Sequence, residues 1–193
     1  NKNLCTTATI DALRDCEICL YDSLMDHKLL EELPSTAEAI DVGKRCGAHS
    51  KQQQVITDLL CDRARRGKKV IRLKGGDPGI FGRLTEEITA LEELKIAYRV
   101  IPGISALQAA TTGTGMLLTR RDVSRGFVAL TPRAAAGKLA PCDANEKSTL
   151  PIVYYMSIKA MDHITKELLN DGYLKSTPVA VIYNAGGLDQ EIF

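Results

Sequence analysis

The sequence predicts an α/β fold in which helices cover a parallel sheet. Short apolar runs that are typical of strands alternate with longer amphipathic runs that are typical of helices. The connections between the runs are short, and glycine or proline closes most of them. Because parallel strands are joined by crossover helices, this rhythm favours a sheet with helices on its faces. The 193 residues suffice for one large domain or two small ones, and we expect two α/β domains.

Eight elements are predicted in the first half of the chain. Ser50 can cap the start of a long amphipathic helix, and Gly67 can close it. Pro102 and Gly103 end the last strand. In chain order the predicted elements are helix 6–17, strand 18–22, helix 25–33, strand 38–43, helix 50–66, strand 69–76, helix 84–95 and strand 97–103.

The second half repeats this style without repeating the sequence. Its predicted elements are strands 125–131, 150–156 and 178–184, with helix 158–172 between the last two strands. Small polar residues with proline and glycine predict a loop between 132 and 147. The segment "PGISALQAATTGTG" is rich in small residues, so we expect a boundary there, with domains at 1–104 and 105–193. A parallel α/β domain normally opens with a strand, so we expect the first strand to be missing and the second domain to be incomplete.

The composition argues against several classes of partner. The formal net charge is +1, which gives no electrostatic case for binding nucleic acid or an acidic membrane surface. No apolar run approaches the roughly 18 residues that a membrane span needs, and no signal-peptide pattern opens the chain. We therefore expect a cytoplasmic protein that uses neither nucleic acid nor a membrane as a partner.

Two of the six cysteines, Cys16 and Cys19, form a CxxC pair. This spacing occurs in zinc and redox sites, but no second pair accompanies it and no histidine lies close in sequence. A chain of this length does not need disulfides for its core. We interpret the pair as two small buried thiols where a helix gives way to a strand, and we predict no metal site.

A glycine-rich loop, "RLKGGDPGIFGR" (72–83), lies between a predicted strand and a predicted helix. It lacks the GK[ST] ending of a P-loop and the spacing of GxGxxG. Pro78 removes a backbone N–H and Asp77 adds a negative charge, so the loop is unsuited to phosphate. It suits a neutral or cationic ligand that approaches the backbone closely, and the positively charged sulfonium of S-adenosylmethionine fits. Taken alone, the loop is equally typical of a tight turn with an Asx-type hydrogen bond.

Six motifs, taken in order, resemble those of the tetrapyrrole methyltransferases, and among them the enzymes that methylate uroporphyrinogen III. The motifs are "VGKRCGAHS", "RLKGGDPGIFGR", "VIPGISALQAA", "LLTRRD", "IVYYM" and "TPVAVIYNA". Each is weak alone, but together they cover essentially the whole chain. The resemblance implies the tetrapyrrole methylase fold, with two α/β domains, a cofactor cleft between them, and a homodimer.

The resemblance also implies a set of residues that bind S-adenosylmethionine and release its product, S-adenosylhomocysteine. Met156 would contact the tetrapyrrole as well as the donor; without the resemblance it would be a core residue at a strand end. Ala185 stands where a small residue lets the backbone approach adenosine. The full implied set is Gly75, Gly76, Asp77, Ile80, Ser105, Ala106, Met156 and Ala185.

Two residues match the positions proposed for proton transfer: Asp22 as the proton acceptor and Lys44 as the proton donor. A carboxylate at the carboxyl end of a strand is well placed for this chemistry. Without the resemblance, Asp22 would be a helix cap and Lys44 a solvated lysine. Uroporphyrinogen III carries eight carboxylates, and Arg45, Arg120 and Arg121 are candidates to bind them. Solvated surface pairs remain the alternative for these arginines.

The implied reaction is the methylation of uroporphyrinogen III at C2 and C7, which gives precorrin-2 for sirohaem and cobalamin synthesis. One alternative is another precorrin methyltransferase, such as a precorrin-4 C11-methyltransferase. A second is a non-catalytic donor- or tetrapyrrole-binding part of a fused protein. Several positions depart from the family pattern: Leu84-Thr85 replaces a Gly-Gly pair, Pro132-Arg133 follows "FVALT", and Ser157 follows "YYM". With the missing strand, these departures leave open an inactive or weakly active chain.

Overall fold

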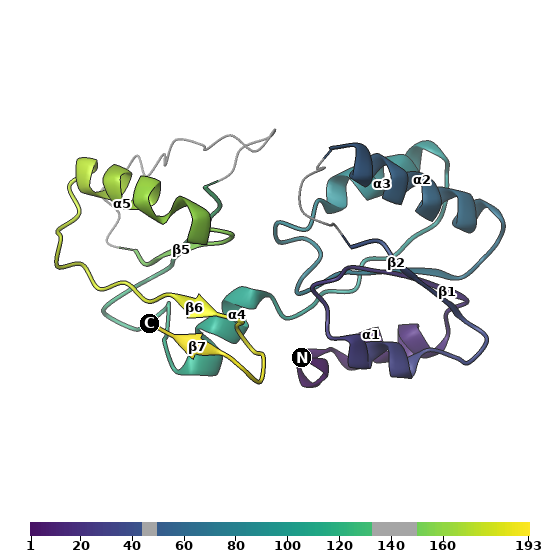
Figure 1. Ribbon diagram of the computed structural model, residues 1–193, viewed down its shortest axis with the longest axis horizontal. Helices are drawn as coiled ribbons and strands as arrows, with labels where there is room; N and C mark the ends of the chain where they lie inside the picture. Colours follow the sequence, from purple (N-terminus) through teal and green to yellow (C-terminus); the bar gives the residue numbers. More distant parts are fainter. Residues whose placement is uncertain (44–49, 133–149) are drawn as a thin grey trace. The chain divides into compact units, whose positions relative to one another are not determined.

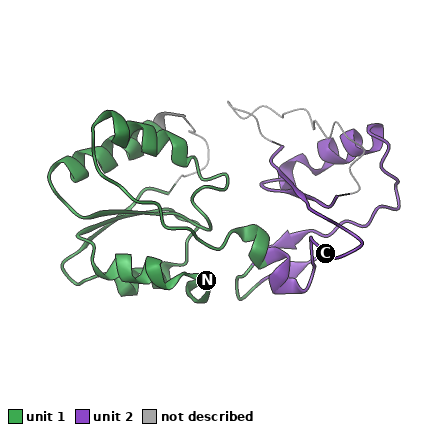
Figure 2. Ribbon diagram, turned by 180° about the vertical axis from the view of Figure 1, so that it is seen from behind, with its two compact units in different colours: residues 1–109, 186–189 green, residues 110–185, 190–193 purple. Residues whose placement is uncertain are grey.

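The computed structural model describes residues 1–43, 50–132 and 150–193 (Figure 1). The chain divides into two compact units (Figure 2). Unit 1 comprises residues 1–109 and 186–189, and unit 2 comprises residues 110–185 and 190–193. The expected division into domains 1–104 and 105–193 stays a prediction.

Unit 1 is built on a three-stranded parallel sheet with the order β2-β1-β3. Its strands are β1 (Ile18–Tyr21), β2 (Glu38–Asp41) and β3 (Val70–Leu73). In register, Leu20 of β1 lies between Ile40 and Arg72. The central strand is apolar along its length because helices cover both of its faces. The predicted parallel sheet and the positions of these strands are therefore confirmed.

Helices lie on both sides of this sheet (Figure 1). One face packs against α2 (Ser50–Arg65) and α3 (Leu84–Glu93), where Ile18 and Leu20 meet Leu60 and Leu91. The other face packs against α1 (Thr7–Arg14) and the 3₁₀ helix η2 (His27–Glu32); a further 3₁₀ turn, η1 (Lys2–Leu4), precedes α1.

Local signals set the helix ends. The Thr6 side chain accepts a hydrogen bond from the Thr9 N–H and caps α1. Gly67 has a positive φ and closes α2 as predicted.

One strand prediction in unit 1 is wrong. Residues 97–103 form no strand, although "AYRVIPG" has the composition of one. Among the described residues the sheet ends at β3, and no neighbouring strand pairs with 97–103. A strand needs ladder partners for its backbone groups, and composition alone does not supply them.

Unit 2 contains less regular structure among its described residues. The strands β4 (Val128–Leu130) and β5 (Ile152–Tyr154) form a parallel pair, as the sequence predicts. A 3₁₀ turn, η5 (Ile158–Ala160), leads into α5 (Met161–Asn170). A short helix, α4 (Ala106–Ala110), and the 3₁₀ turn η3 (Thr112–Thr114) lie where the chain passes from unit 1 to unit 2.

The predicted strand 178–184 is largely wrong. Only β6 (Ile182–Tyr183) is a strand, and it pairs antiparallel with β7 (Glu191–Ile192). The flanking Val181 and Phe193 exchange backbone hydrogen bonds of 2.9 Å in each direction. Pairing therefore stops after a short ladder, because the residues before Val181 meet no partner strand among the described ones.

The thiols of Cys16 and Cys19 lie in the core between the sheet, α1 and η2. Both cysteines are free, and burial raises the pKa of the Cys16 thiol and raises that of Cys19 to about 12. Such thiols are poor nucleophiles and poor metal ligands. The predicted burial of both thiols is confirmed. Over the part of the chain that the structure describes, no helix is long and apolar enough to cross a membrane.

Candidate functional site

The carboxyl ends of β1 and β3 bring the predicted acid–base residue next to the glycine loop. Asp22 follows β1, and its N–H donates to the carbonyl of Leu73 at 3.3 Å. Gly75 follows β3, and the place where its Cβ would stand is 3.8 Å from the carbonyl oxygen of Leu24. Ligands of open parallel sheets bind at this edge, so the geometry agrees with a binding site here.

The glycine loop packs directly on a second loop, which precedes α4. A Cβ at Gly103 would stand 2.3 Å from the Gly76 carbonyl oxygen, so no side chain fits there. Gly76 itself has φ +81°, a backbone conformation that favours glycine. The Cβ position of Gly76 lies 3.6 Å from Ser105 Cα and 3.7 Å from the Ala106 nitrogen. The structure thus brings together four of the residues predicted for the donor: Gly76, Asp77, Ser105 and Ala106.

Asp77 ties these two loops together with its carboxylate. Oδ1 accepts a hydrogen bond of 2.8 Å from the Gly79 N–H, which forms the Asx-type turn that the sequence left open. Oδ2 accepts a bond of 3.1 Å from the Gly103 N–H. The Asp77 carbonyl accepts from the N–H of Ile80, whose side chain is exposed. Asp77 therefore makes the turn and also fixes the distance between the loops.

A buried ionic network lies beneath the glycine loop. Glu87 of α3 is 2% exposed and accepts hydrogen bonds from Arg72 Nε at 3.1 Å, Lys74 Nζ at 2.7 Å and Gln53 Nε2 at 3.1 Å. Burial lowers the pKa of Lys74, opposed by its hydrogen bond to Glu87. Arg72 also donates through Nη2 to Oδ1 of Asp22 at 2.5 Å. The network thus joins α3 and β3 to the predicted proton acceptor.

Sequence reasoning missed four residues of this region: Arg72, Lys74, Glu87 and Gly103. A signal existed for two of them. In "VIRLK", Arg72 and Lys74 are two residues apart in an otherwise apolar strand, so they fall on one face of the sheet. Two cations on a face covered by helices require a buried carboxylate. Nothing local in the sequence singled out Glu87 as that carboxylate.

The other predicted residues that the structure describes belong to unit 2. Met156 follows β5 with φ +55°, and it is 55% exposed, so it is not a core residue. Ala185 is half-buried after β6. Arg120 and Arg121 are exposed, and neither guanidinium has an ion-pair partner among the described residues. Lys44 and Arg45 lie outside the described residues.

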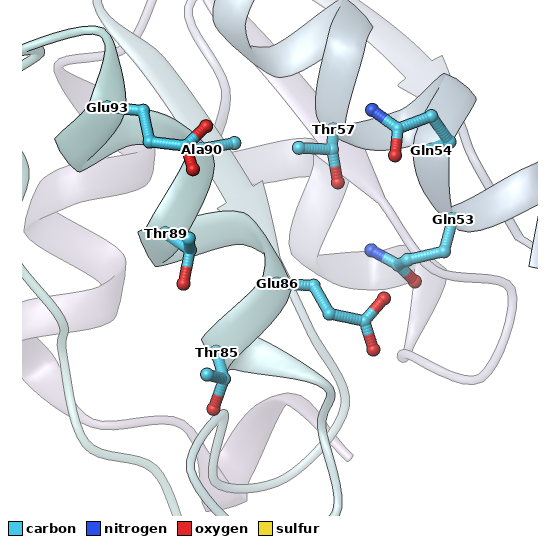
Figure 3. A pocket seen from close by; sticks show the side chains of 8 residues that line it. All are labelled: Gln53, Gln54, Thr57, Thr85, Glu86, Thr89, Ala90 and Glu93. Atoms are coloured by element: carbon cyan, nitrogen blue, oxygen red, sulfur yellow. The ribbon is translucent and has the colours of Figure 1, made fainter. Parts of the chain in front are cut away.

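A surface groove of about 360 Å³ lies between α2 and α3 (Figure 3). Seven of the eight residues that line it have polar side chains, among them Gln53, Thr57, Thr85 and Glu86. None of the residues predicted for the donor or the substrate lines it. In the described part of the chain, no group of three or more His, Cys, Asp or Glu side chains could hold a metal ion.

The chain as a whole matches one protein family. The sequence profile of the tetrapyrrole (corrin/porphyrin) methylases matches residues 1–193. The chain belongs to the tetrapyrrole methylases.

This tetrapyrrole methylase is similar to curated proteins along its whole length. It is 38% identical over 194 residues to the uroporphyrinogen-III C-methyltransferase of Methanocaldococcus jannaschii, covering 100% of this chain and 80% of that protein. It is 36% identical over 197 residues to a siroheme synthase of a Psychrobacter species, covering 100% of this chain and 40% of that protein. The methylase thus spans most of the first relative and less than half of the second.

Solved structures share its fold. The uroporphyrin-III C-methyl transferase from Thermus thermophilus, in its native form and in a complex with S-adenosylhomocysteine, superposes with a TM-score of 0.84 at 30% identity. The complex covers 99% of this methylase and 81% of that chain. A cobalt precorrin-4 methyltransferase has a TM-score of 0.81 at 27% identity, covering 100% of this chain and 80% of that one. The predicted family, fold class and enzyme class are confirmed.

Proposed function

We propose that this tetrapyrrole methylase transfers methyl groups from S-adenosylmethionine to C2 and C7 of uroporphyrinogen III. The product would be precorrin-2, which feeds sirohaem and cobalamin synthesis. The observation that carries the proposal is the whole-chain similarity to a uroporphyrinogen-III C-methyltransferase at 38% identity. The donor is that of the family, and the similar Thermus structure holds its demethylated product.

The glycine loop fits this donor. The backbone of Gly75 and Gly76 is exposed at the carboxyl edge of the sheet, and Asp77 adds a negative charge beside it. Lys74, the nearest cation in sequence, is held by Glu87. The exposed backbone and the negative charge suit a cationic sulfonium better than a phosphate. In the proposed site, Gly75, Gly76, Ser105 and Ala106 bind the donor through their backbone, and Ile80, Met156 and Ala185 complete its surroundings.

In this proposal Asp22 acts as the base, because its carboxylate lies at the carboxyl end of β1. When bound, the donor supplies an electrophilic methyl group. A pyrrole carbon of the substrate attacks that methyl, so a C–C bond forms while the S–CH₃ bond breaks and its electron pair stays on sulfur. The ring then loses a proton, which Asp22 accepts, and this loss offsets the positive charge gained with the methyl group. In this proposal Lys44 donates a proton to the macrocycle as its double bonds rearrange, and the ring releases a second proton in exchange. Acid–base assistance of this kind contributes about 10²–10⁴ in rate, and most of the rest comes from positioning.

We propose that local arginines account for recognition of the substrate. The net charge of +1 gives no general attraction for a molecule with eight carboxylates, so binding depends on local arginines. In this proposal Arg45, Arg120 and Arg121 bind the acetate and propionate arms, and Met156 contacts the macrocycle. We also propose that the methylase works as a cytoplasmic homodimer.

A methyl-transfer assay combined with calorimetry tests this function. The purified protein, given labelled S-adenosylmethionine and uroporphyrinogen III, should add two labelled methyl groups to each tetrapyrrole, as measured by mass spectrometry. S-adenosylhomocysteine should bind in calorimetry. Donor binding without methyl transfer would favour the non-catalytic part of a fused protein, a reading that the 40% coverage of the siroheme synthase keeps open. Transfer to precorrin-4 but not to uroporphyrinogen III would favour the precorrin alternative, which the similarities do not favour.

A further inference from the structure

The guanidinium of Arg72 connects helix α3 to the carboxyl ends of β1 and β3. Nε donates to Glu87 at 3.1 Å, and Nη1 donates to the carbonyls of Leu20 at 3.3 Å and Leu73 at 2.9 Å. Nη2 donates to Oδ1 of Asp22 at 2.5 Å. All three nitrogens therefore hold an acceptor, and the planar group has a single orientation in which it can reach all of them.

Glu87 of α3 fixes the orientation of the Arg72 guanidinium by accepting the hydrogen bond from its Nε. Its carboxylate is fully buried and receives donors from Arg72, Lys74 and Gln53, which come from β3, the end of β3, and α2. A buried carboxylate with this many donors cannot rotate without leaving one of them unpaired, which is costly in a low-dielectric interior. Glu87 is therefore a rigid anchor for the guanidinium.

Asp22 lies at the opposite end of this chain of contacts. Its side chain is 29% exposed, whereas that of Arg72 is 10% exposed and that of Glu87 is 2% exposed. The described residues give Oδ1 one partner, Arg72, and give Oδ2 none. The contacts thus run from a buried anchor to a partly exposed carboxylate whose Oδ2 has no hydrogen-bond partner among the described residues.

We propose that Arg72, anchored by Glu87, is a positioning residue that holds the Asp22 carboxylate in place for proton transfer. The inference rests on the proposed role of Asp22 as the proton acceptor. It assigns the network a function beyond stability, since a buried ion pair by itself is weak support for a stabilising role. Proton transfer depends steeply on the distance and direction between the acceptor and the carbon acid, so a loosened carboxylate lowers the rate of the chemical step.

A double-mutant cycle separates positioning from general damage. Arg72→Lys keeps a positive charge but removes the planar group that reaches four acceptors. The single variant should lose about 10- to 100-fold in the single-turnover rate of methyl transfer, the size expected for a displacement of about 1 Å. The affinity for S-adenosylhomocysteine, measured by calorimetry, should change less than about threefold. In an Asp22→Ala background, Arg72→Lys should change the residual rate less than about threefold, because no carboxylate remains to be positioned.

Two outcomes overturn the proposal, and they are distinguishable. If Arg72→Lys lowers the rate by the same factor with and without Asp22, then Arg72 does not position Asp22. The proposed role of Asp22 as the proton acceptor is not affected by that result. If Asp22→Ala leaves the rate unchanged, the acceptor role itself is wrong, and the inference falls with it. Arg14→Lys is the matched control, because Arg14 also pairs with a glutamate, Glu32, but on the α1 side of the sheet; its rate should not change.

A second variant covers the case in which Arg72→Lys does not fold. Glu87→Gln keeps the shape of the anchor and an oxygen acceptor but removes its charge. It should lower the rate with Asp22 present and leave the residual rate of Asp22→Ala unchanged. An equal loss in both backgrounds would again contradict positioning. Donor affinity is measured in parallel, because Lys74 precedes Gly75 and also loses its ionic partner.

Discussion

The carboxylate of Asp77 has two properties, a negative charge and the capacity to accept hydrogen bonds from two loops. A negative charge beside a glycine loop disfavours phosphate, and the same carboxylate accepts the N–H groups of Gly79 and Gly103. The first property follows from the residue type, and the second depends on where two loops meet. The Asp77 side chain is therefore part of the internal structure of the glycine loop, and we propose that its charge also attracts a cationic ligand.

Replacing Asp77 should therefore weaken the donor site by loosening it. Asp77→Ala leaves two N–H groups without their acceptor, which should cost about 1–3 kcal/mol of stability and lower the affinity for S-adenosylhomocysteine. Asp77→Asn keeps one side-chain oxygen as an acceptor, so its stability and its affinity for S-adenosylhomocysteine should lie between those of the wild type and of Asp77→Ala. Thermal unfolding and calorimetry measure these effects. Asp11→Ala, an exposed position of α1, is the control, and an Asp77→Ala protein as stable as that control would contradict the role.

In unit 1, the strands and α4 position the two loops that form the proposed donor site. The loop after β3 and the loop before α4 meet at Gly76 and Gly103, and no side chain fits at Gly103. Asp22 follows the end of β1, beside the end of β3. Strand order decides this, because β1 and β3 are neighbours and their carboxyl ends lie at one edge. Gly75 differs from Gly103: a Cβ there would meet its nearest atoms at 3.8 Å, an ordinary contact.

Two glycine variants should separate loop packing from ligand contact. Gly103→Ala places a methyl 2.3 Å from the Gly76 carbonyl, so it should lower both the thermal midpoint and donor affinity, with a stability loss of about 1–3 kcal/mol. Gly75→Ala should leave the thermal midpoint nearly unchanged and still reduce donor affinity, since the proposed donor approaches that backbone. Calorimetry and thermal unfolding of both variants measure this. Full donor affinity in Gly75→Ala would remove Gly75 from the proposed site.

The molecule as a whole has nearly balanced charge, with a formal net charge of +1. Three of its carboxylates nevertheless have lowered pKa values, because they accept hydrogen bonds. The Lys68 side chain and the Lys69 N–H lower the pKa of Glu17, which connects the start of β1 to the start of β3. Backbone N–H groups lower the pKa of Asp26, and side-chain hydrogen bonds from Lys2 and Arg14 lower that of Glu32. All three carboxylates belong to unit 1 and join segments distant in sequence.

The stability of the protein should fall in acid for this reason. A carboxylate whose pKa is lower in the folded state stabilises the fold above its unfolded value of about 4, and that contribution is lost as the pH falls through the folded value. The thermal midpoint should be nearly level between about pH 7 and 5 and should fall below about pH 4.5. Glu17→Gln should make the fall shallower. Glu93→Gln, on the exposed face of α3, should leave the acid-induced fall in the thermal midpoint unchanged. An equal effect of the two variants would contradict the attribution of the fall to Glu17.

Much of the fold could be predicted where the signal is local. Periodicity predicts the helix from Ser50 to Arg65 and the three paired strands of unit 1. The preference of cysteine for the interior predicts the burial of Cys16 and Cys19. The strand predicted at 97–103 failed because its existence depends on a neighbour in the sheet, and the strand at 178–184 shrank for the same reason. Residue composition reports a preference for extended backbone, whereas a ladder requires a second segment.

The family, the α/β class and the unsuitability of the glycine loop for phosphate could all be inferred from the amino-acid sequence, because each depends on short runs of residues adjacent along the chain. The hydrogen bond between Asp77 and Gly103, and the contacts that join Glu87, Arg72 and Asp22, became apparent only in the folded structure. The partners in these contacts are far apart in sequence. A hydrogen bond depends on the distance and direction between two groups, and only the folded chain brings those groups together.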